Sequence, residues 1–210
     1  MIDHPVNDLD KQKLVRLTER TNNKPYKAFL YDCDGTLADN MDAHKGAYQD
    51  VARTYGFDLD LNIIDELAGW PTIQVAEELS KRYGVIFDPI EFAEAKSARF
   101  IAHYILHTQP VRFVVEHLKQ HRANVCIGVV SGGRRSTVSK TLEVLGITDL
   151  LDVLVCAGDT PKGKPHPDPF LKAAERLGIS PEDCIVFEDG DPGVQAAISA
   201  NMDWVRVDQI

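Results

Sequence analysis

The chain has 210 residues, of which 44% are hydrophobic and 26% are charged, and 32 acidic against 23 basic residues give a net charge of −9 at pH 7. This length allows one full domain with a smaller inserted one, and the composition is that of an ordinary globular protein. The acidic surface repels nucleic acid and anionic membranes, so we expect neither as a partner and predict a monomer or small homo-oligomer.

The N-terminal region and the cysteines predict a cytoplasmic protein. Residues 1–8 lack the basic and apolar segments of a signal peptide, and no apolar run is long enough to span a membrane. The four cysteines form no CxxC pair, which predicts reduced thiols. Residues 1–24 are polar apart from an amphipathic stretch around Leu9, Leu14 and Leu17, and we interpret them as a loosely attached arm with a possible helix.

An alternation of strands and helices begins after this arm. Five apolar runs are typical of buried strands: residues 28–31, 125–130, 153–156, 184–187 and 204–207. Amphipathic helical stretches separate the later runs, at residues 134–145, 169–177 and 193–200. This alternation predicts an α/β fold with a doubly wound parallel sheet and helices on both faces.

Two acids one residue apart, Asp32 and Asp34, follow the first apolar run. Alternate side chains of an extended strand share a face, so the two carboxylates tend to project together where the strand ends. Gly35 then allows a sharp turn, and Thr36 and a third acid, Asp39, follow. Paired acids repel each other unless they share a cation or a proton, and this arrangement suits Mg²⁺ bound by a few carboxylates plus a phosphate.

The alternation is interrupted between about residues 41 and 109. Only helical patterns occur there, at about 43–55, 61–67, 72–83 and 90–107. An all-helical insertion after the first strand predicts a small cap over the carboxyl edge of the sheet, where open α/β sheets bind ligands. The predicted division is a core of residues 25–40 and 110–210, similar to a Rossmann fold, and a cap of residues 41–109.

A serine and two glycines follow the second apolar run. Gly132 and Gly133 leave backbone amides free to approach an anion, and Ser131 adds a hydroxyl donor. The helix that starts near Arg134 points its positive end at the same place. An ordinary flexible turn between strand and helix is the alternative.

Lys164 follows the third run, within a segment that nearly matches the phosphate-binding motif G-x-x-x-x-G-K-[ST]. Pro165 stands where that motif needs serine or threonine, and it disfavours helical geometry at Lys164, so the motif interpretation fails. Lys164 still qualifies as a single phosphate-binding cation, with a solvated surface lysine as the alternative.

Further acids follow the fourth run. Glu188 and Asp189 would complete a hard-cation site with the acids of the first strand. Asp191 and Pro192 are typical of a helix start, with Asp191 as the N-cap. Both interpretations hold together, since capping needs only Asp191.

These four motifs, in this order, resemble those of the haloacid dehalogenase-like superfamily of phosphohydrolases over residues 27–208. The segment 32–36, Asp-Cys-Asp-Gly-Thr, is highly specific for it. The segments 163–168 and 187–197 and the helical cap are similar to the branch of β-phosphoglucomutase and sugar phosphatases. Within this branch, segments 68–72 and 200–203 are most similar to fructose-1-phosphatase-type hydrolases.

The resemblance implies a mechanism through an aspartyl-phosphate. Asp32 would be the nucleophile, and Asp34 would protonate the leaving alcohol and later take the proton of the attacking water. The resemblance also implies that Mg²⁺ is held by Asp32, the Asp34 carbonyl and Asp189, with Glu188 binding it directly or supporting its ligands. Charge on the phosphoryl group would be stabilised by Ser131 and Lys164, together with the backbone amides of Gly35 and Thr36.

The cap would set specificity. His44 matches a histidine that assists proton transfer in the mutase branch, with a helix-surface histidine as the alternative. Lys96 and Arg99, on a predicted cap helix, either contact substrate or face solvent, and Trp70 either lines the pocket or packs within the cap. The candidate substrate-binding residues are therefore Gly35, Thr36, His44, Lys96, Gly132 and Gly133.

The leading interpretation is a Mg²⁺-dependent phosphatase of small phosphorylated metabolites, sugar phosphates above all. The mutases carry an arginine where this chain has Thr72, so a bisphosphate intermediate would be poorly retained. Dehalogenases lack the second acid that Asp34 provides, and a catalytically silent binding module is disfavoured because all motif residues are intact. The pairs His103/His107 and His117/His121 have helical spacing without further zinc ligands, which predicts surface or packing histidines.

Overall fold

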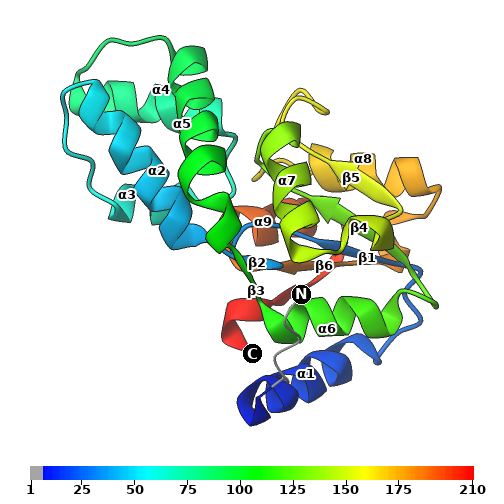
Figure 1. Ribbon diagram of the computed structural model, residues 1–210. Helices are drawn as coiled ribbons and strands as arrows, with labels where there is room; N and C mark the ends of the chain where they lie inside the picture. The colour runs from blue at the N-terminus through cyan, green and yellow to red at the C-terminus, as the bar shows by residue number, and fades with distance from the viewer. Residues whose placement is uncertain (1–6) are drawn as a thin grey trace.

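The computed structural model describes residues 7–210 (Figure 1), so the first six residues of the predicted arm lie outside the described residues. Its main sheet has five parallel strands in the order β5-β4-β1-β6-β7. Their bounds are Ala28–Tyr31 (β1), Cys126–Val130 (β4), Val153–Val155 (β5), Cys184–Glu188 (β6) and Asp203–Arg206 (β7). Each strand lies within one residue of its predicted bounds.

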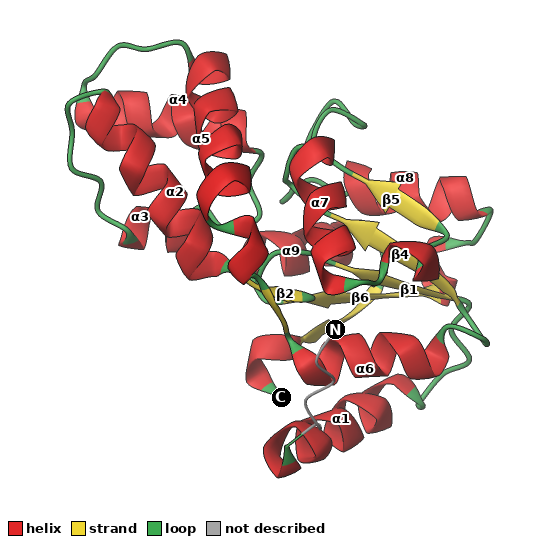
Figure 2. Ribbon diagram, viewed as in Figure 1, coloured by secondary structure: helices red, strands yellow, loops and turns green. Residues whose placement is uncertain are grey.

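Helices cover both faces of this sheet (Figure 2), which confirms the predicted doubly wound α/β fold. The helices of the core are α6 (Arg112–His121), α7 (Arg135–Leu145), α8 (Asp168–Leu177) and α9 (Asp191–Ser199). Side chains of α6 and α7 pack with Phe29 and Tyr31, whereas those of α8 and α9 pack with Ala28 and Leu30. Because successive side chains of β1 point to opposite faces, this central strand anchors both cores.

Strand β7 lies at the edge of the sheet and pairs only with β6. The predicted burial of residues 204–207 is therefore wrong for Trp204, which is 42% exposed. An apolar run alone does not distinguish a central strand from an edge strand.

The chain leaves the sheet through β2 (Ala38–Asp39) and returns through β3 (Gln109–Pro110), which pair in antiparallel orientation. A group of helices lies between them, beside the sheet (Figure 1, cyan to green): α2 (Met41–Thr54), α3 (Asn62–Glu66), α4 (Thr72–Tyr83) and α5 (Pro89–His103). Apolar side chains of these helices and of the segments that join them form a separate core around Phe57, Leu79 and Phe92. We call α2–α5 the cap helices, while the division into cap and core domains stays a prediction.

The N-terminal helix α1 (Asp8–Thr21) packs against α6. Leu17 is fully buried, and the Thr21 hydroxyl lies 3.1 Å from Nε2 of the buried His117. The possible helix is confirmed, but the interpretation as a loosely attached arm is wrong for residues 8–21, because these contacts fix the helix on the core. Helix α6 is not among the predicted elements.

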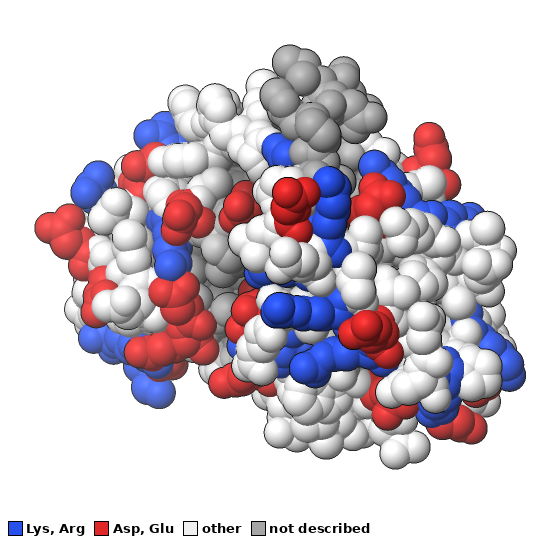
Figure 3. All heavy atoms as spheres, turned by 90° about the horizontal axis from the view of Figure 1, so that it is seen from below, with Lys and Arg blue, Asp and Glu red and all other residues white. Residues whose placement is uncertain are grey.

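The histidine pairs and the cysteines lie where the sequence predicts, in packed or exposed positions. His117 and His121 pack against Phe29, whereas His103 and His107 are exposed. All four cysteines are free thiols. Acidic and basic side chains are interspersed on the face that Figure 3 shows. Among residues 7–210, every helix is too short or too polar to cross a membrane.

Candidate active site

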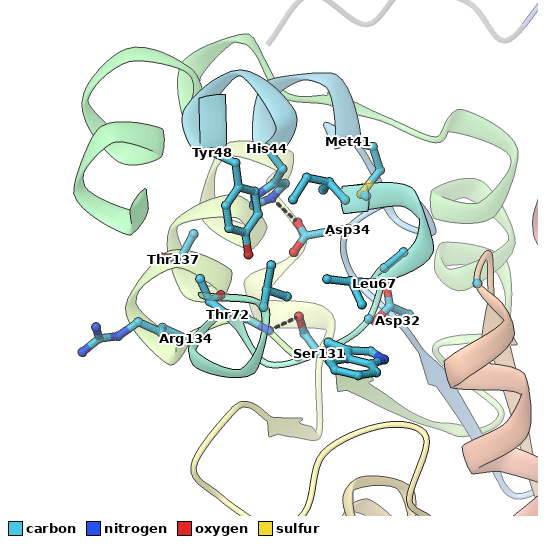
Figure 4. Close-up of a pocket in the computed structure, with 18 of the residues that line it drawn as sticks. Asp32, Asp34, Met41, His44, Tyr48, Leu67, Thr72, Ser131, Arg134 and Thr137 are labelled. Carbon is cyan, nitrogen blue, oxygen red and sulfur yellow. Dashed lines mark hydrogen bonds and ion pairs between the residues drawn. The ribbon is translucent and has the colours of Figure 1, made fainter. Parts of the chain in front are cut away.

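A pocket lies between the carboxyl edge of the sheet and the cap helices (Figure 4). Its lining comes from the segments that follow β1, β4 and β6 and from side chains of α2, α4, α5 and α7. Nine of the predicted site residues line it: Asp32, Asp34, His44, Lys96, Ser131, Gly132, Gly133, Glu188 and Asp189. Ligands of open α/β sheets bind at this edge, so the pocket is the candidate active site.

Three carboxylates gather at one side of this pocket. Asp32 follows β1, Glu188 is the last residue of β6, and Asp189 comes next. One oxygen of each lies within 4.8 Å of the other two. Burial raises the pKa of Asp32 and of Glu188 to about 7 and the pKa of Asp189 to about 6. Acids this close and this buried need a shared cation or proton.

Lys164 supplies one such cation. Its Nζ donates to Asp32 Oδ1 at 2.5 Å, to Glu188 Oε1 at 2.5 Å and to the Val130 carbonyl at 2.9 Å. Burial opposes the charge of Lys164, but the two carboxylates outweigh it and hold the pKa of the ammonium above its usual value. The alternative of a solvated surface lysine is wrong, because the side chain is only 1% exposed.

The acid cluster fits a divalent metal ion. When all three carboxylates are ionised they contribute −3 and Lys164 contributes +1, which leaves a net charge of −2 for a cation to balance. Carboxylate oxygens are the donors that hard cations such as Mg²⁺ prefer. Asp32, Glu188 and Asp189 are therefore the residues that could hold such an ion.

Gly35 and Thr36 position Asp189 and do not line the pocket. Gly35 has a φ of +91°, and a Cβ there would overlap the Asp189 carboxylate, so glycine meets two requirements at once. The Thr36 hydroxyl donates to Asp189 Oδ1 at 2.9 Å. The prediction that the Gly35 amide serves a phosphoryl oxygen is wrong, because this amide donates to the Ala38 carbonyl at 2.8 Å.

Asp34 faces the cap helices, away from the acid cluster. Its Oδ1 accepts from Asn40 Nδ2 at 2.7 Å and lies 3.1 Å from Nε2 of His44 (Figure 4). Burial alone would raise the pKa of Asp34, but His44 and Asn40 outweigh it and hold this pKa well below its usual range. Asp34 is therefore a carboxylate in this state of the site.

His44 connects Asp34 to a second buried lysine, Lys96 of α5. Lys96 Nζ lies 2.5 Å from His44 Nδ1, and the imidazole stacks on Phe100 with a centroid distance of 4.0 Å. An ammonium can only donate, so Nδ1 accepts and a neutral His44 carries its proton on Nε2, toward Asp34. The alternatives of a helix-surface histidine and a solvent-facing Lys96 are wrong, because both side chains are buried.

The segment after β4 offers donors beside the acids. Ser131 is buried and its Oγ accepts from the Gly133 amide at 3.0 Å, which leaves its own O–H available as a donor. A Cβ on Gly132 would lie 2.5 Å from the Gly69 carbonyl of the cap, so this glycine lets the two parts of the chain approach closely. Such a segment can hold an anion next to Asp32 and Lys164.

Several other predicted residues lie elsewhere. Asp39 is exposed on β2, and Arg99 pairs with Asp50 on the outside of the cap helices. The prediction that Asp191 caps α9 is wrong, because Gly190 is the N-cap and Asp191 pairs with Arg206. Trp70 and Thr72 line the pocket, and Trp70 also packs against the cap core.

The structure adds three residues that the sequence patterns do not identify: Asn40, Tyr48 and Thr137. Asn40 orients Asp34, and Tyr48 and Thr137 line the pocket from α2 and α7. The proximity of Asn40 to the acidic motif is a usable signal in the sequence. Tyr48 and Thr137 lie far apart along the chain, and no local pattern distinguishes them from ordinary helix residues.

Comparisons with known proteins agree with this geometry. Residues 29–207 match the family model described as haloacid dehalogenase-like hydrolase. The chain is 31% identical to fructose-1-phosphate phosphatase of Escherichia coli, over 87% of this chain and 96% of that one. It is 29% identical to the phosphorylated carbohydrates phosphatase of Thermotoga maritima, over 85% and 83%. The crystal structure of β-phosphoglucomutase from Clostridium difficile covers 85% of this chain and 83% of its own, with a TM-score of 0.78 and 26% identity.

Proposed function

Since this chain belongs to the haloacid dehalogenase-like hydrolase family, we propose that it is a Mg²⁺-dependent phosphatase that releases phosphate from sugar phosphates through an aspartyl-phosphate. The names of the two phosphatases to which it is similar support a phosphorylated carbohydrate as substrate. The observation that carries the proposal is the placement of Asp32 at the pocket, in contact with the Lys164 ammonium and clustered with Glu188 and Asp189.

The proposed metal site consists of Asp32, Glu188 and Asp189, together with the backbone carbonyl of Asp34. A bound Mg²⁺ would neutralise negative charge on the phosphoryl group and on the acids. Thr36 keeps Asp189 oriented toward this site, and Lys164 keeps Asp32 and Glu188 in place. Glu188 also accepts from the amides of Asp189 and Gly190, at 3.2 and 3.4 Å, which fixes its orientation.

In the first step, an oxygen of Asp32 attacks phosphorus and the bond from phosphorus to the ester oxygen breaks. Lys164 and the Ser131 hydroxyl stabilise the charge on the transferring group, since both lie beside Asp32. The leaving oxygen takes its proton from Asp34. The arriving phosphate dianion raises the pKa of Asp34 by repulsion, which allows this carboxylate to acquire the proton that it needs.

In the second step, Asp34 takes a proton from water as that water attacks phosphorus, which releases phosphate and restores Asp32. The resting state of Asp34 suits this role, because Asn40 and His44 hold it as a carboxylate. The proton on Nε2 of His44 keeps Asp34 oriented, and Lys96 keeps that proton on Nε2. Asp34 thus acts first as an acid and then as a base.

Thr72 supports hydrolysis rather than phosphoryl return. It lines the pocket at the start of α4, the position at which the mutases carry an arginine. A hydroxyl cannot replace the bidentate guanidinium contact to a second phosphate. A bisphosphate would therefore be held weakly, and water completes the reaction.

The test is phosphate release from a panel of sugar phosphates and nucleotides, after treatment with a chelator and after addition of Mg²⁺. We expect Mg²⁺-dependent release by the wild type and none above background by Asp32→Asn. Asp39→Asn is the matched control, because Asp39 is an exposed acid of the same motif that lies outside the pocket. A folded wild type that releases no phosphate, or Asp32→Asn with wild-type turnover, would overturn the proposal.

A further inference from the structure

Three hydroxyl groups line the pocket on the side away from Asp32 (Figure 4). They belong to Tyr48 of α2, Thr72 at the start of α4 and Thr137 in the first turn of α7. Thr137 lies on a helix that packs on the sheet, whereas Tyr48 and Thr72 lie on cap helices. These three side chains therefore come together only where the two parts of the chain meet.

The Thr137 hydroxyl is the one that needs a ligand. Thr137 is only 5% exposed, and its Oγ1 has no hydrogen-bond partner among residues 7–210. A threonine in a helix commonly donates to the carbonyl four residues earlier. Here that carbonyl belongs to Gly133, and it already accepts the Ala157 amide at 3.0 Å. A buried hydroxyl without a partner is destabilising, so a bound molecule that completes it gains affinity.

The surroundings of Thr137 favour a neutral ligand group over an anion. Lys96 and Arg134 are the two ammonium or guanidinium groups among the described lining residues. Lys96 donates to His44, and Arg134 pairs with Glu94 of α5 at 3.1 Å. Apolar side chains, among them Leu67, Trp70 and Val75, also line the pocket between the acids and Thr137's side. A group that both donates and accepts hydrogen bonds, such as an alcohol, matches this environment better than a second phosphate or a carboxylate.

We propose that Thr137 is a specificity-determining residue whose hydroxyl bonds a hydroxyl of the leaving group, so that the enzyme selects phosphate esters of neutral polyols. This inference rests on the proposed function and deepens it. The phosphoryl group occupies the acidic side of the pocket, beside Asp32 and Lys164. The carbon chain of the leaving group then extends past the apolar lining, and one of its hydroxyls reaches Thr137.

The test compares kcat/KM for a hexose phosphate with kcat/KM for phenyl phosphate, whose leaving group has no further hydroxyl. Thr137→Val removes the hydroxyl and keeps the shape, and we expect it to lower the ratio of the two values roughly tenfold. Thr137→Ser retains the hydroxyl and should keep the ratio close to that of the wild type. Thr141→Val is the matched control, because Thr141 lies one turn further along α7, is also buried and unpartnered among the described residues, and does not line the pocket.

A series of monodeoxy analogues of the hexose phosphate locates the partner hydroxyl and does not depend on the folding of any variant. In the wild type, one analogue should lose roughly tenfold in kcat/KM, and Thr137→Val should cause no further loss for that analogue. An unchanged ratio in Thr137→Val, or equal ratios in Thr137→Val and Thr141→Val, would overturn this inference. The proposed function would still stand if the wild type released phosphate. A wild type that hydrolyses none of the esters would overturn both.

Discussion

Two lysines are buried near the pocket, Lys164 behind the acids and Lys96 on the cap side, and their pKa values shift in opposite directions. Burial disfavours the charge of both, but the direct carboxylate contacts of Lys164 keep its pKa above the usual value. Lys96 contacts the His44 ring instead, and burial lowers its pKa to about 8. Two buried lysines thus have pKa shifts of opposite sign, because the group in contact with a buried charge determines how far burial disfavours that charge.

This difference separates two roles. Lys164 belongs to the acid cluster, whose net charge of −2 with all three carboxylates ionised suits a divalent ion. The ammonium of Lys96 is buried without a carboxylate in contact, which disfavours its charge, and it lies next to the histidine that contacts Asp34. The acidic side of the pocket therefore stabilises charged groups through direct ion pairs. On the cap side, the protonation of Lys96 and His44 is sensitive to nearby charge. Three changes test this contrast.

The largest effect is expected for Lys164→Met. This change leaves Asp32 and Glu188 buried without their cation, and phosphate release should fall roughly 10³-fold, as for the loss of a preorganised charge donor. Metal-free stability should also fall, by about 3–5 kcal/mol, as for a broken buried ion pair. Because the cluster then carries −3, Mg²⁺ should raise the melting temperature more in the variant than in the wild type.

Lys162→Met is the control for this change, since Lys162 is an exposed lysine two residues earlier. Phosphate release and thermal melting with and without Mg²⁺ measure both proteins. If Lys164→Met were as stable and as active as Lys162→Met, the ammonium would be dispensable and the two sides of the pocket would not differ as described.

A smaller effect is expected for Gly35→Ala. The added methyl group overlaps the Asp189 carboxylate, so Asp189 must move away from Asp32 and Glu188. We expect the Mg²⁺ concentration for half-maximal activity to rise roughly 10–100-fold, as for changes that disturb the orientation of a metal ligand. Activity at saturating Mg²⁺ should recover much of its wild-type value.

Gly56→Ala separates the overlap from backbone strain. Gly56 has a φ of +82°, close to that of Gly35, but a Cβ there has no neighbour within 4 Å. Both variants incur the strain of a left-handed alanine, which should lower thermal stability similarly. If Gly56→Ala raised the Mg²⁺ requirement as much as Gly35→Ala does, backbone strain and not the displacement of Asp189 would be the cause of the rise.

The acidic side of the pocket could be predicted from sequence much better than the cap side. Asp32, Asp34, Glu188 and Asp189 follow apolar strands directly, and a parallel sheet brings its carboxyl ends together whatever the helices do. The sequence also points to Lys164 but does not predict its burial, because the burial of a lysine in a loop depends on contacts with residues that are remote in sequence.

The cap side depends on contacts between distant segments, which sequence patterns do not report. His44 and Lys96 are 52 residues apart and meet only when α2 packs against α5. Thr137 lines the same pocket as Tyr48 and Thr72 only because the fold brings α7 and the cap helices to that pocket. The same reason accounts for the docking of α1 on α6 and for the exposure of Trp204, since burial is set by neighbours that the local pattern does not specify.

The last test concerns the charge of Lys96, and its expected effect is on the pH dependence of stability. An unfolded lysine titrates near 10.5, whereas Lys96 in the folded protein titrates near 8. Between these two values the unfolded state binds one proton more, so wild-type stability should rise with pH in this window. The difference between the two pKa values corresponds to a gain on the order of 3 kcal/mol.

Lys96→Met removes this titration, so its free energy of unfolding should lack the rise between about pH 8 and 10.5 that the wild type shows. Lys81→Met, at an exposed lysine of the cap helices, should keep the rise. Urea unfolding at several pH values measures all three proteins. Because His44 loses the donor that fixes its tautomer, Lys96→Met should also lower phosphate release roughly tenfold. Parallel pH curves for wild type and Lys96→Met would mean that Lys96 has an ordinary pKa, and the contrast between the two buried lysines would then fail.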